Sequence, residues 1–125
     1  MITVKIPVAT PSLNETNRWQ RRERWKIKSH RETMRDAVWA ELIRVGMWPI
    51  PAPDRRVDIR ITRYSAGELD DDNYRGGAKY LMDALTELSL IRDDSPEWVH
   101  VAYKQRKCPK GEGHTVVEID RGKLE

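Results

Sequence analysis

The 125-residue sequence predicts a single α+β domain in which two helices pack on one small mixed sheet, in the order β-α-β-α-β-β. Four short segments alternate apolar and polar residues, as half-buried strands do. Two longer segments carry apolar residues at helical spacing. The length is close to that of one common domain and too short for two, so we treat residues 1–125 as one unit.

Four strands are expected, two early and two late in the chain. The first covers residues 2–7 and is closed by prolines, and the second is centred on residues 57–61, after a stiff proline-rich connector at 48–53. The third and fourth cover 99–103 and 115–119. Because two glycines lie in the connection 109–113, we expect these last two strands to form a hairpin.

Helical spacing predicts two helices. Ser29 and Glu32 match a capping box, and apolar residues then recur at helical spacing until Gly46. The second helix is expected to begin just after Gly76-Gly77, because adjacent glycines are poor helix interiors. The stretch 10–28 is polar, basic and aperiodic, which predicts a long basic loop, and residues 121–125 are expected to form a flexible tail.

The composition excludes several classes of protein. The lone Cys108 leaves no internal disulfide framework and no cysteine-rich zinc site, and it fits a reducing compartment. No apolar run approaches the roughly 18 residues that a membrane span needs. We therefore expect a cytoplasmic protein without a membrane segment. His30, His100 and His114 share no ligand spacing and are assigned no role.

Positive charge is concentrated in one stretch, although the net charge is only +3. Seven Lys or Arg residues lie between Arg18 and Arg31, against a single acid. Such a run suits a phosphate backbone, whose binding is driven largely by counterion release, but a solvated surface has the same composition. Trp19 and Trp25 within it can stack on unpaired bases or simply pack. The candidate DNA-binding residues are Arg18, Arg21, Arg22, Arg24, Lys26 and Lys28.

The run Asp70-Asp71-Asp72-Asn73 stands between a predicted strand and a predicted helix. If Asp70 belongs to extended backbone, Asp70 and Asp72 point to the same side and Asp71 points away. Carboxylates that converge repel one another unless a proton or cation lies between them, and oxygen ligands favour Mg²⁺ or Mn²⁺. The alternative is that Asp72 or Asn73 only caps the helix. A calcium loop of the EF-hand type is excluded, because Tyr74 and Arg75 occupy its required ligand and glycine positions.

A second acidic pair, Asp93-Asp94, can return to the first. A helix from Gly77 to about Glu87 is roughly 16 Å long, whereas the seven extended residues that follow can cover roughly 23 Å. The alternative is a plain acidic turn before Ser95-Pro96. Lys79 precedes Asp83 by one helical turn, so it either forms a surface ion pair or directs a cation at a phosphate.

Residues 69–95 resemble the core of the RusA family of Holliday junction resolvases. The family pattern is Asp-x-Asp-Asn, then Lys-x-x-x-Asp-Ala-Leu, then Asp-Asp before a strand, and each piece has a counterpart here. Pro11-Ser12-x-Asn14 is also similar to the start of that family. Lys79 follows Asn73 by six residues, about three more than in the best-known members, which makes Arg75 a rival for the phosphate-binding role. By resemblance, Asp70, Asp72 and Asp94 are metal-binding catalytic carboxylates, Lys79 is the catalytic lysine, and Asn73, Asp83 and Asp93 are supporting residues.

The resemblance implies a Mg²⁺-dependent endodeoxyribonuclease, with Mn²⁺ as a substitute, that resolves four-way DNA junctions by phosphodiester hydrolysis in recombination or repair. It also implies a bacterial or phage-encoded protein. Because a junction is cut on two strands, a two-fold homodimer is the natural assembly. The alternatives are a nuclease for other branched DNA and a non-catalytic DNA-binding protein of the same fold. A small nucleotide phosphatase is disfavoured, because a small substrate needs no such basic stretch.

Overall fold

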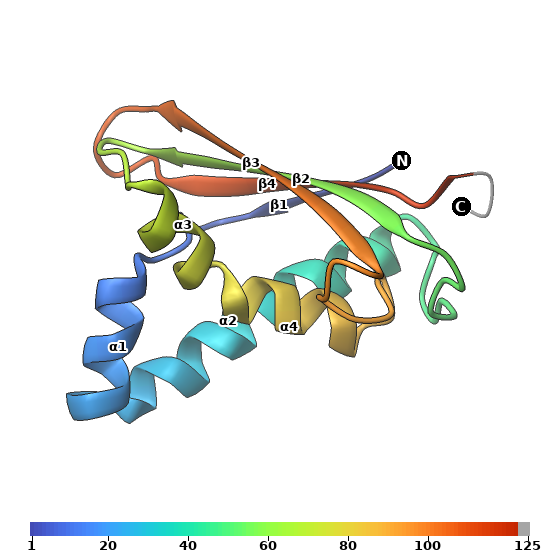
Figure 1. The fold of residues 1–125 in the computed structure, drawn as a ribbon, viewed down its shortest axis with the longest axis horizontal. Coiled ribbons are helices and arrows are strands. Elements are labelled where there is room, and N and C mark those ends of the chain that lie inside the picture. The colour runs from blue at the N-terminus through green and yellow to red at the C-terminus, as the bar shows by residue number, and fades with distance from the viewer. Residues whose placement is uncertain (123–125) are drawn as a thin grey trace.

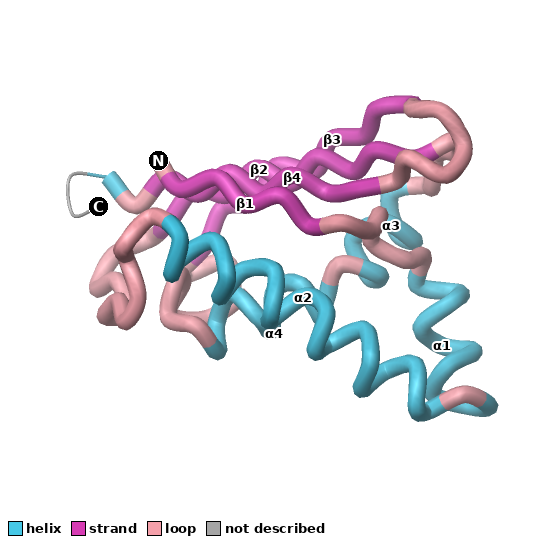
Figure 2. Tube along the Cα trace, turned by 180° about the vertical axis from the view of Figure 1, so that it is seen from behind, coloured by secondary structure: helices cyan, strands magenta, loops and turns pink. Residues whose placement is uncertain are grey.

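The computed structural model describes residues 1–122, and it has one mixed sheet with helices on one of its faces (Figure 1). Helices α2 (Arg24–Arg44) and α4 (Lys79–Glu87) lie under the sheet, as the view from behind also shows (Figure 2). The predicted α+β class and element order are confirmed. The strands are β1 (Ile2–Ile6), β2 (Val57–Ser65), β3 (Val99–Lys107) and β4 (His114–Asp120).

The order of strands across the sheet is β1-β4-β2-β3. The strand β2 pairs in parallel with β3 and antiparallel with β4, and β4 pairs antiparallel with β1. The predicted hairpin of the last two strands is therefore wrong, because β3 and β4 flank β2 on opposite sides. Parallel pairing of β2 with β3 needs a long crossover, and the helical segment between these two strands supplies it.

The core lies between the sheet and helices α2 and α4. Burial in β1 alternates along the strand, as the sequence alternation requires, and the inner residues of β2 and β4 are buried in the same way. Helices α2 and α4 complete the core with apolar residues at helical spacing. Fully buried side chains include Val4, Ile61, Ile119, Met34, Val38, Leu42, Leu81 and Leu85.

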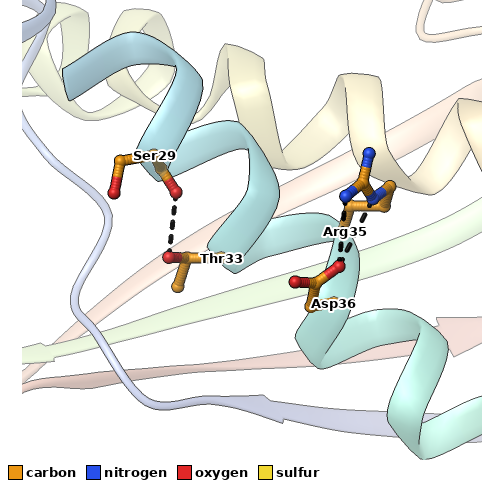
Figure 3. A network of polar contacts seen from close by, with 4 residues as sticks. All are labelled: Ser29, Thr33, Arg35 and Asp36. Atoms are coloured by element: carbon orange, nitrogen blue, oxygen red, sulfur yellow. Dashed lines mark hydrogen bonds and ion pairs between the residues drawn. The ribbon is translucent and has the colours of Figure 1, made fainter. Parts of the chain in front are cut away.

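The predicted loop at 10–28 is wrong, because helix α1 (Leu13–Arg22) occupies most of it and α2 already begins at Arg24. The capping box belongs to α1: the Ser12 hydroxyl accepts from the Glu15 backbone N–H at 3.0 Å, and the Glu15 carboxylate accepts from the Ser12 N–H at 3.4 Å. Ser29 instead lies inside α2, where its carbonyl accepts from the Thr33 hydroxyl (Figure 3). Helix α1 buries only Thr16, so it has no apolar stripe for the sequence to reveal.

The second predicted helix begins just after the glycine pair, as expected, because α4 starts at Lys79. A separate short helix, α3 (Asp71–Gly77), precedes α4 and ends with both glycines. A Cβ atom at Gly77 would lie 1.8 Å from the carbonyl oxygen of Pro11, and one at Gly76 would lie 2.9 Å from the side chain of Leu13. The glycines therefore allow α3 to pack closely against the start of α1, which projects away from the sheet (Figure 1).

The end of the chain is ordered farther than expected. Arg121, in the predicted flexible tail, is buried and donates a hydrogen bond to the carbonyl of Pro51 at 2.7 Å. The rest of that predicted tail, residues 123–125, lies outside the described residues. Within residues 1–122, none of the helices is both long and apolar enough to cross a membrane.

Candidate functional site

The acidic run at the start of α3 is held in place by two contacts with the sheet. The Gln105 side chain on β3 binds both backbone groups of Leu69, accepting from its N–H at 2.9 Å and donating to its carbonyl at 2.8 Å. The Tyr74 hydroxyl lies 3.0 Å from the Ile61 carbonyl and 2.8 Å from the Lys104 carbonyl. The acidic residues between these two contacts are thereby fixed against β2 and β3.

Asp70 is the residue that caps α3. Its backbone is extended, as we assumed, and its carboxylate accepts from the Asn73 backbone N–H at 2.9 Å and from the Asn73 side-chain amide at 3.0 Å. These two hydrogen bonds hold the pKa of Asp70 below its usual value. The Asn73 side-chain oxygen accepts from the Asn14 backbone N–H at 3.2 Å, which ties α3 to α1. The capping alternative is therefore met by Asp70, and not by Asp72 or Asn73.

Asp71 and Arg75 form an exposed pair on the next face of α3. The Arg75 Nε lies 2.8 Å from the Asp71 carboxylate, and the guanidinium stands 4.6 Å from the centre of the Tyr103 ring on β3. Both groups are thus already engaged with the protein. Asp72 follows Asp71 in the first turn of α3, and its side chain is exposed.

The pair Asp93-Asp94 lies in the connection from α4 to β3. Leu90 and Ile91 are fully buried just before it, so they pin the returning chain. Asp93 and Asp94 line a hollow of about 350 Å³ together with Asp83 and Glu87 of α4 and with Arg31 of α2. Asp70, Asp71, Asp72 and Asn73 line a different hollow of about 400 Å³, beside Leu13 and Asn14. The two acidic runs therefore face separate depressions.

Tyr103 is electrostatically linked to both acidic runs. Burial raises the pKa of its hydroxyl, Arg75 lowers it, and the carboxylates of Asp94 and Asp71 raise it further. Sequence patterns gave no signal for Tyr103, because a tyrosine in an alternating strand reads as an ordinary sheet residue.

The expected metal ligands have suitable chemistry but are not assembled. Carboxylate and carboxamide oxygens are the donors that Mg²⁺ prefers. Among residues 1–122, however, no group of three or more His, Cys, Asp or Glu side chains is placed to hold a metal ion. Asp70 is bound to Asn73, while Asp94 lines the other hollow. Among the described residues, Asp70, Asp72 and Asp94 therefore offer the right donor atoms but do not converge on one point.

Lys79, the first residue of α4, lies 3.7 Å from Asp83, and its side chain is 65% exposed. Asp83 lines the hollow that contains Asp93 and Asp94. This position allows both roles that the sequence suggested for Lys79, a surface ion pair or a cation that binds a phosphate. Arg75 differs from Lys79, because its guanidinium is held by a carboxylate and a ring.

Four cations follow one face of α2 and form what we call the basic stripe: Arg24, Lys28, Arg31 and Arg35. Their spacing of four, three and four residues places them on one side of the helix. They line a hollow of about 520 Å³ that also includes Glu87. Arg31 and Glu87 belong to this hollow and to the acidic one as well, so the two depressions adjoin.

The predicted DNA-binding residues are divided by this geometry. Arg24 and Lys28 belong to the basic stripe, while the others lie elsewhere: Arg18, Arg21 and Arg22 are exposed on α1, and Lys26 pairs with Glu23 at 3.1 Å. Arg35 was not predicted, and in the structure it also bonds Asp36 at 3.3 Å (Figure 3). Helical periodicity would have identified it, had residues 24–28 been recognised as helical.

Comparison of the chain with protein-family models and with curated proteins gave no significant match in either case.

Proposed function

We propose that this protein is a structure-specific endodeoxyribonuclease that hydrolyses phosphodiester bonds in branched DNA, with the four-way junction as its substrate. The observation that carries the proposal is that the hollow lined by the basic stripe adjoins the hollow lined by Asp83, Asp93 and Asp94. The basic stripe spans twelve residues, and its first and last members lie roughly 16 Å apart along the helix, which matches the axial length of about five phosphates of one DNA strand. A backbone bound there would pass directly beside Asp83, Asp93 and Asp94.

Lys79 is the better candidate for the phosphate-directed cation. Charge that develops on a phosphate during hydrolysis is stabilised by a positioned cation. Lys79 has only a long contact of 3.7 Å with Asp83, so a phosphate can replace that partner at little cost. Arg75 would have to give up its 2.8 Å contact with Asp71 and its stacking on Tyr103. In our proposal Lys79 therefore binds the phosphate, and Arg75 positions α3 against β3.

A requirement for Mg²⁺, with Mn²⁺ as a substitute, is part of the proposal. It is supported by the resemblance of residues 69–95 to the RusA family and by the oxygen donors of Asp70, Asp72 and Asp94. The catalytic assignment of these three aspartates, with Asn73, Asp83 and Asp93 in support, has the same basis. The bacterial or phage origin and a role in recombination or repair also rest on the resemblance alone.

A homodimer would place one site on each of the two strands to be cut. The second half of α2 offers a surface for a second copy, because Trp39 and Ile43 are 46% and 48% exposed and lie one helical turn apart. Exposed apolar side chains that adjoin in this way are typical of interaction surfaces. The basic stripe is confined to residues 24–35, so contact of two copies through Trp39 and Ile43 would leave most of that stripe free.

The test is cleavage of synthetic four-way junctions, flaps and plain duplexes with Mg²⁺ or with a chelator. We expect nicking of the junction only with Mg²⁺, and we expect Asp72→Asn, Asp94→Asn and Lys79→Ala to abolish it. Asp58→Asn is the matched control, because Asp58 is exposed on the face of β2 away from the helices. Tight junction binding without nicking under any metal condition would instead identify a non-catalytic DNA-binding protein. Nicking of flaps alone would identify a nuclease for other branched DNA.

A further inference from the structure

A separate hollow of about 400 Å³ lies between the start of α1 and the first half of α2. Its lining residues include Thr10, Trp19, Trp25, Lys26, His30 and Arg63. We propose that this hollow, which we call the base pocket, receives one unpaired nucleobase of the DNA, stacked against Trp25. The inference rests on the proposed action on branched DNA and adds a specific contact to it. Its volume falls within the ~300–1,000 Å³ of small-molecule pockets in general.

Aromatic rings form one side of the base pocket. Trp25 is 69% exposed and is the second residue of α2, which begins after the bend at Glu23. Trp19 and His30 lie deeper, with ring centres 5.4 Å apart, and His30 also meets the edge of Tyr80 at 5.8 Å. A large exposed indole next to packed rings offers a flat surface to a planar ligand, and every nucleobase has such a face.

Two polar atoms of the residues that line the base pocket lack a hydrogen-bond partner. They are the Nε2 of His30 and the hydroxyl of Thr10, and both are shielded from solvent. Burial lowers the pKa of His30, while Glu15 raises it by a smaller amount, so the ring is neutral at neutral pH. Both atoms lie beneath the surface of the hollow, so a neighbouring side chain must move before they can bind the donors and acceptors at the edge of a base.

The charges around the base pocket favour a base over a phosphate. Arg63 is buried, and its guanidinium already donates to the carbonyls of Thr10 at 2.8 Å and Gly67 at 3.0 Å. Lys26 is paired with Glu23, and Glu15 brings a further carboxylate to the lining. Both cations of the lining are therefore already engaged and an acid lies beside them, whereas an uncharged ring meets aromatic and polar surface.

The base pocket is within reach of DNA bound at the basic stripe. Arg24 belongs to that stripe and Trp25 is the next residue, so the two features lie on adjoining faces at the start of α2. Ser29 and Thr33 line the pocket farther along the helix, where their mutual hydrogen bond is visible in Figure 3. A strand that follows the stripe can thus turn one unpaired base around α2. A base beside the crossover lacks a continuous stack and is displaced at lower cost than one inside a duplex, so the contact would discriminate in favour of branched substrates.

Two measurements test the inference on the full chain, both in a chelator so that nothing is cut. The first is the affinity for a four-way junction and for a duplex of equal length, by fluorescence anisotropy. Base–aromatic stacking predicts that Trp25→Ala weakens junction binding by roughly 5- to 150-fold and leaves duplex binding within about twofold. Trp25→Phe should recover most of the loss. Trp48→Ala is the control, because Trp48 is a partly exposed indole beyond the end of α2 and outside the base pocket.

The second measurement uses junctions that carry the fluorescent base 2-aminopurine at each position next to the crossover. Binding of the wild-type protein should change its emission at one position, and Trp25→Ala and Thr10→Val should remove that change. Equal loss of junction and duplex affinity in Trp25→Ala, or no position with altered emission despite tight junction binding, would overturn the base pocket while leaving the proposed function intact. Failure of the wild-type protein to bind any DNA would refute the function first and the inference with it.

Discussion

Gly77→Ala should strongly destabilise the fold, because Gly77 is the point of closest approach between α3 and the start of α1. A Cβ atom there would meet the Pro11 carbonyl oxygen at 1.8 Å, and ordinary contact begins near 3.4 Å, so the two backbones must separate by about 1.6 Å. Alanine in a helix normally gains about 0.5–1 kcal/mol over glycine, but overpacking against backbone costs about 1–3 kcal/mol or more. We expect a net loss of about 2 kcal/mol or more in the free energy of unfolding.

Gly76→Ala is the matched control for this prediction. Its Cβ atom would meet the side chain of Leu13, at 2.9 Å from the Cδ atoms and 3.0 Å from the Cβ, so the overlap is much milder than the backbone overlap at Gly77. The free energy of unfolding should therefore stay within about 1 kcal/mol of the wild type, as the helical preference of alanine offsets the adjustment. Urea denaturation followed by circular dichroism measures both variants. The reasoning is refuted if Gly77→Ala is as stable as Gly76→Ala.

Four further outcomes are expected. Tyr74→Phe should lower the free energy of unfolding by about 1–2 kcal/mol in urea denaturation, because the two carbonyls that its buried hydroxyl contacts lose their donor. Asp70→Ala should be less stable than the wild type at neutral pH, because hydrogen bonds from Asn73 stabilise the Asp70 carboxylate and lower its pKa. This stabilisation is fully present above the unfolded-state pKa of Asp70 and is lost as the pH falls through its folded-state pKa. The acid denaturation curves of the variant and the wild type should therefore converge at low pH. Arg31→Ala should reduce the slope of log affinity against log salt by about 0.9 on duplex DNA, and an unchanged slope would remove Arg31 from the phosphate contacts. Trp39→Glu should convert a dimer to a monomer in light scattering, whereas a wild-type monomer at high concentration would contradict the proposed surface.

Local sequence patterns predicted the elements that pack on the sheet. The apolar alternation of β1 and β2 and the helical stripe of α2 arise from contact with one flat core, so each is visible in a short window. Helix α1 was missed because it packs mainly against other helices and buries only Thr16. The pairing of β3 with β2 was missed for another reason: strand partners are chosen across the whole chain, and the glycines at 111 and 113 form a turn that joins strands on either side of β2.

The sequence also predicted the residues of the candidate site but not the contacts that hold them. Clusters of like residues, such as Asp70 to Asp72, are evident in sequence, and so is the basic run. What holds them is not evident, because the bonds of Gln105 to Leu69 and of Tyr74 to two carbonyls join residues more than ten positions apart. The basic stripe also depends on knowing that residues 24–35 form one continuous helix, since only helical periodicity brings Arg35 to the same face as Arg24.

The position of β4 between β1 and β2 has a consequence for synthesis of the protein. Ile2 pairs with Ile119, so the first strand finds its only neighbour in the sheet at the far end of the described chain. Contacts between residues so distant in sequence form slowly, because the entropy of loop closure must be lost before they stabilise anything. On the ribosome, β1 must wait unpaired until β4 has emerged, and a product that stops before residue 114 lacks the strand that joins β1 to β2.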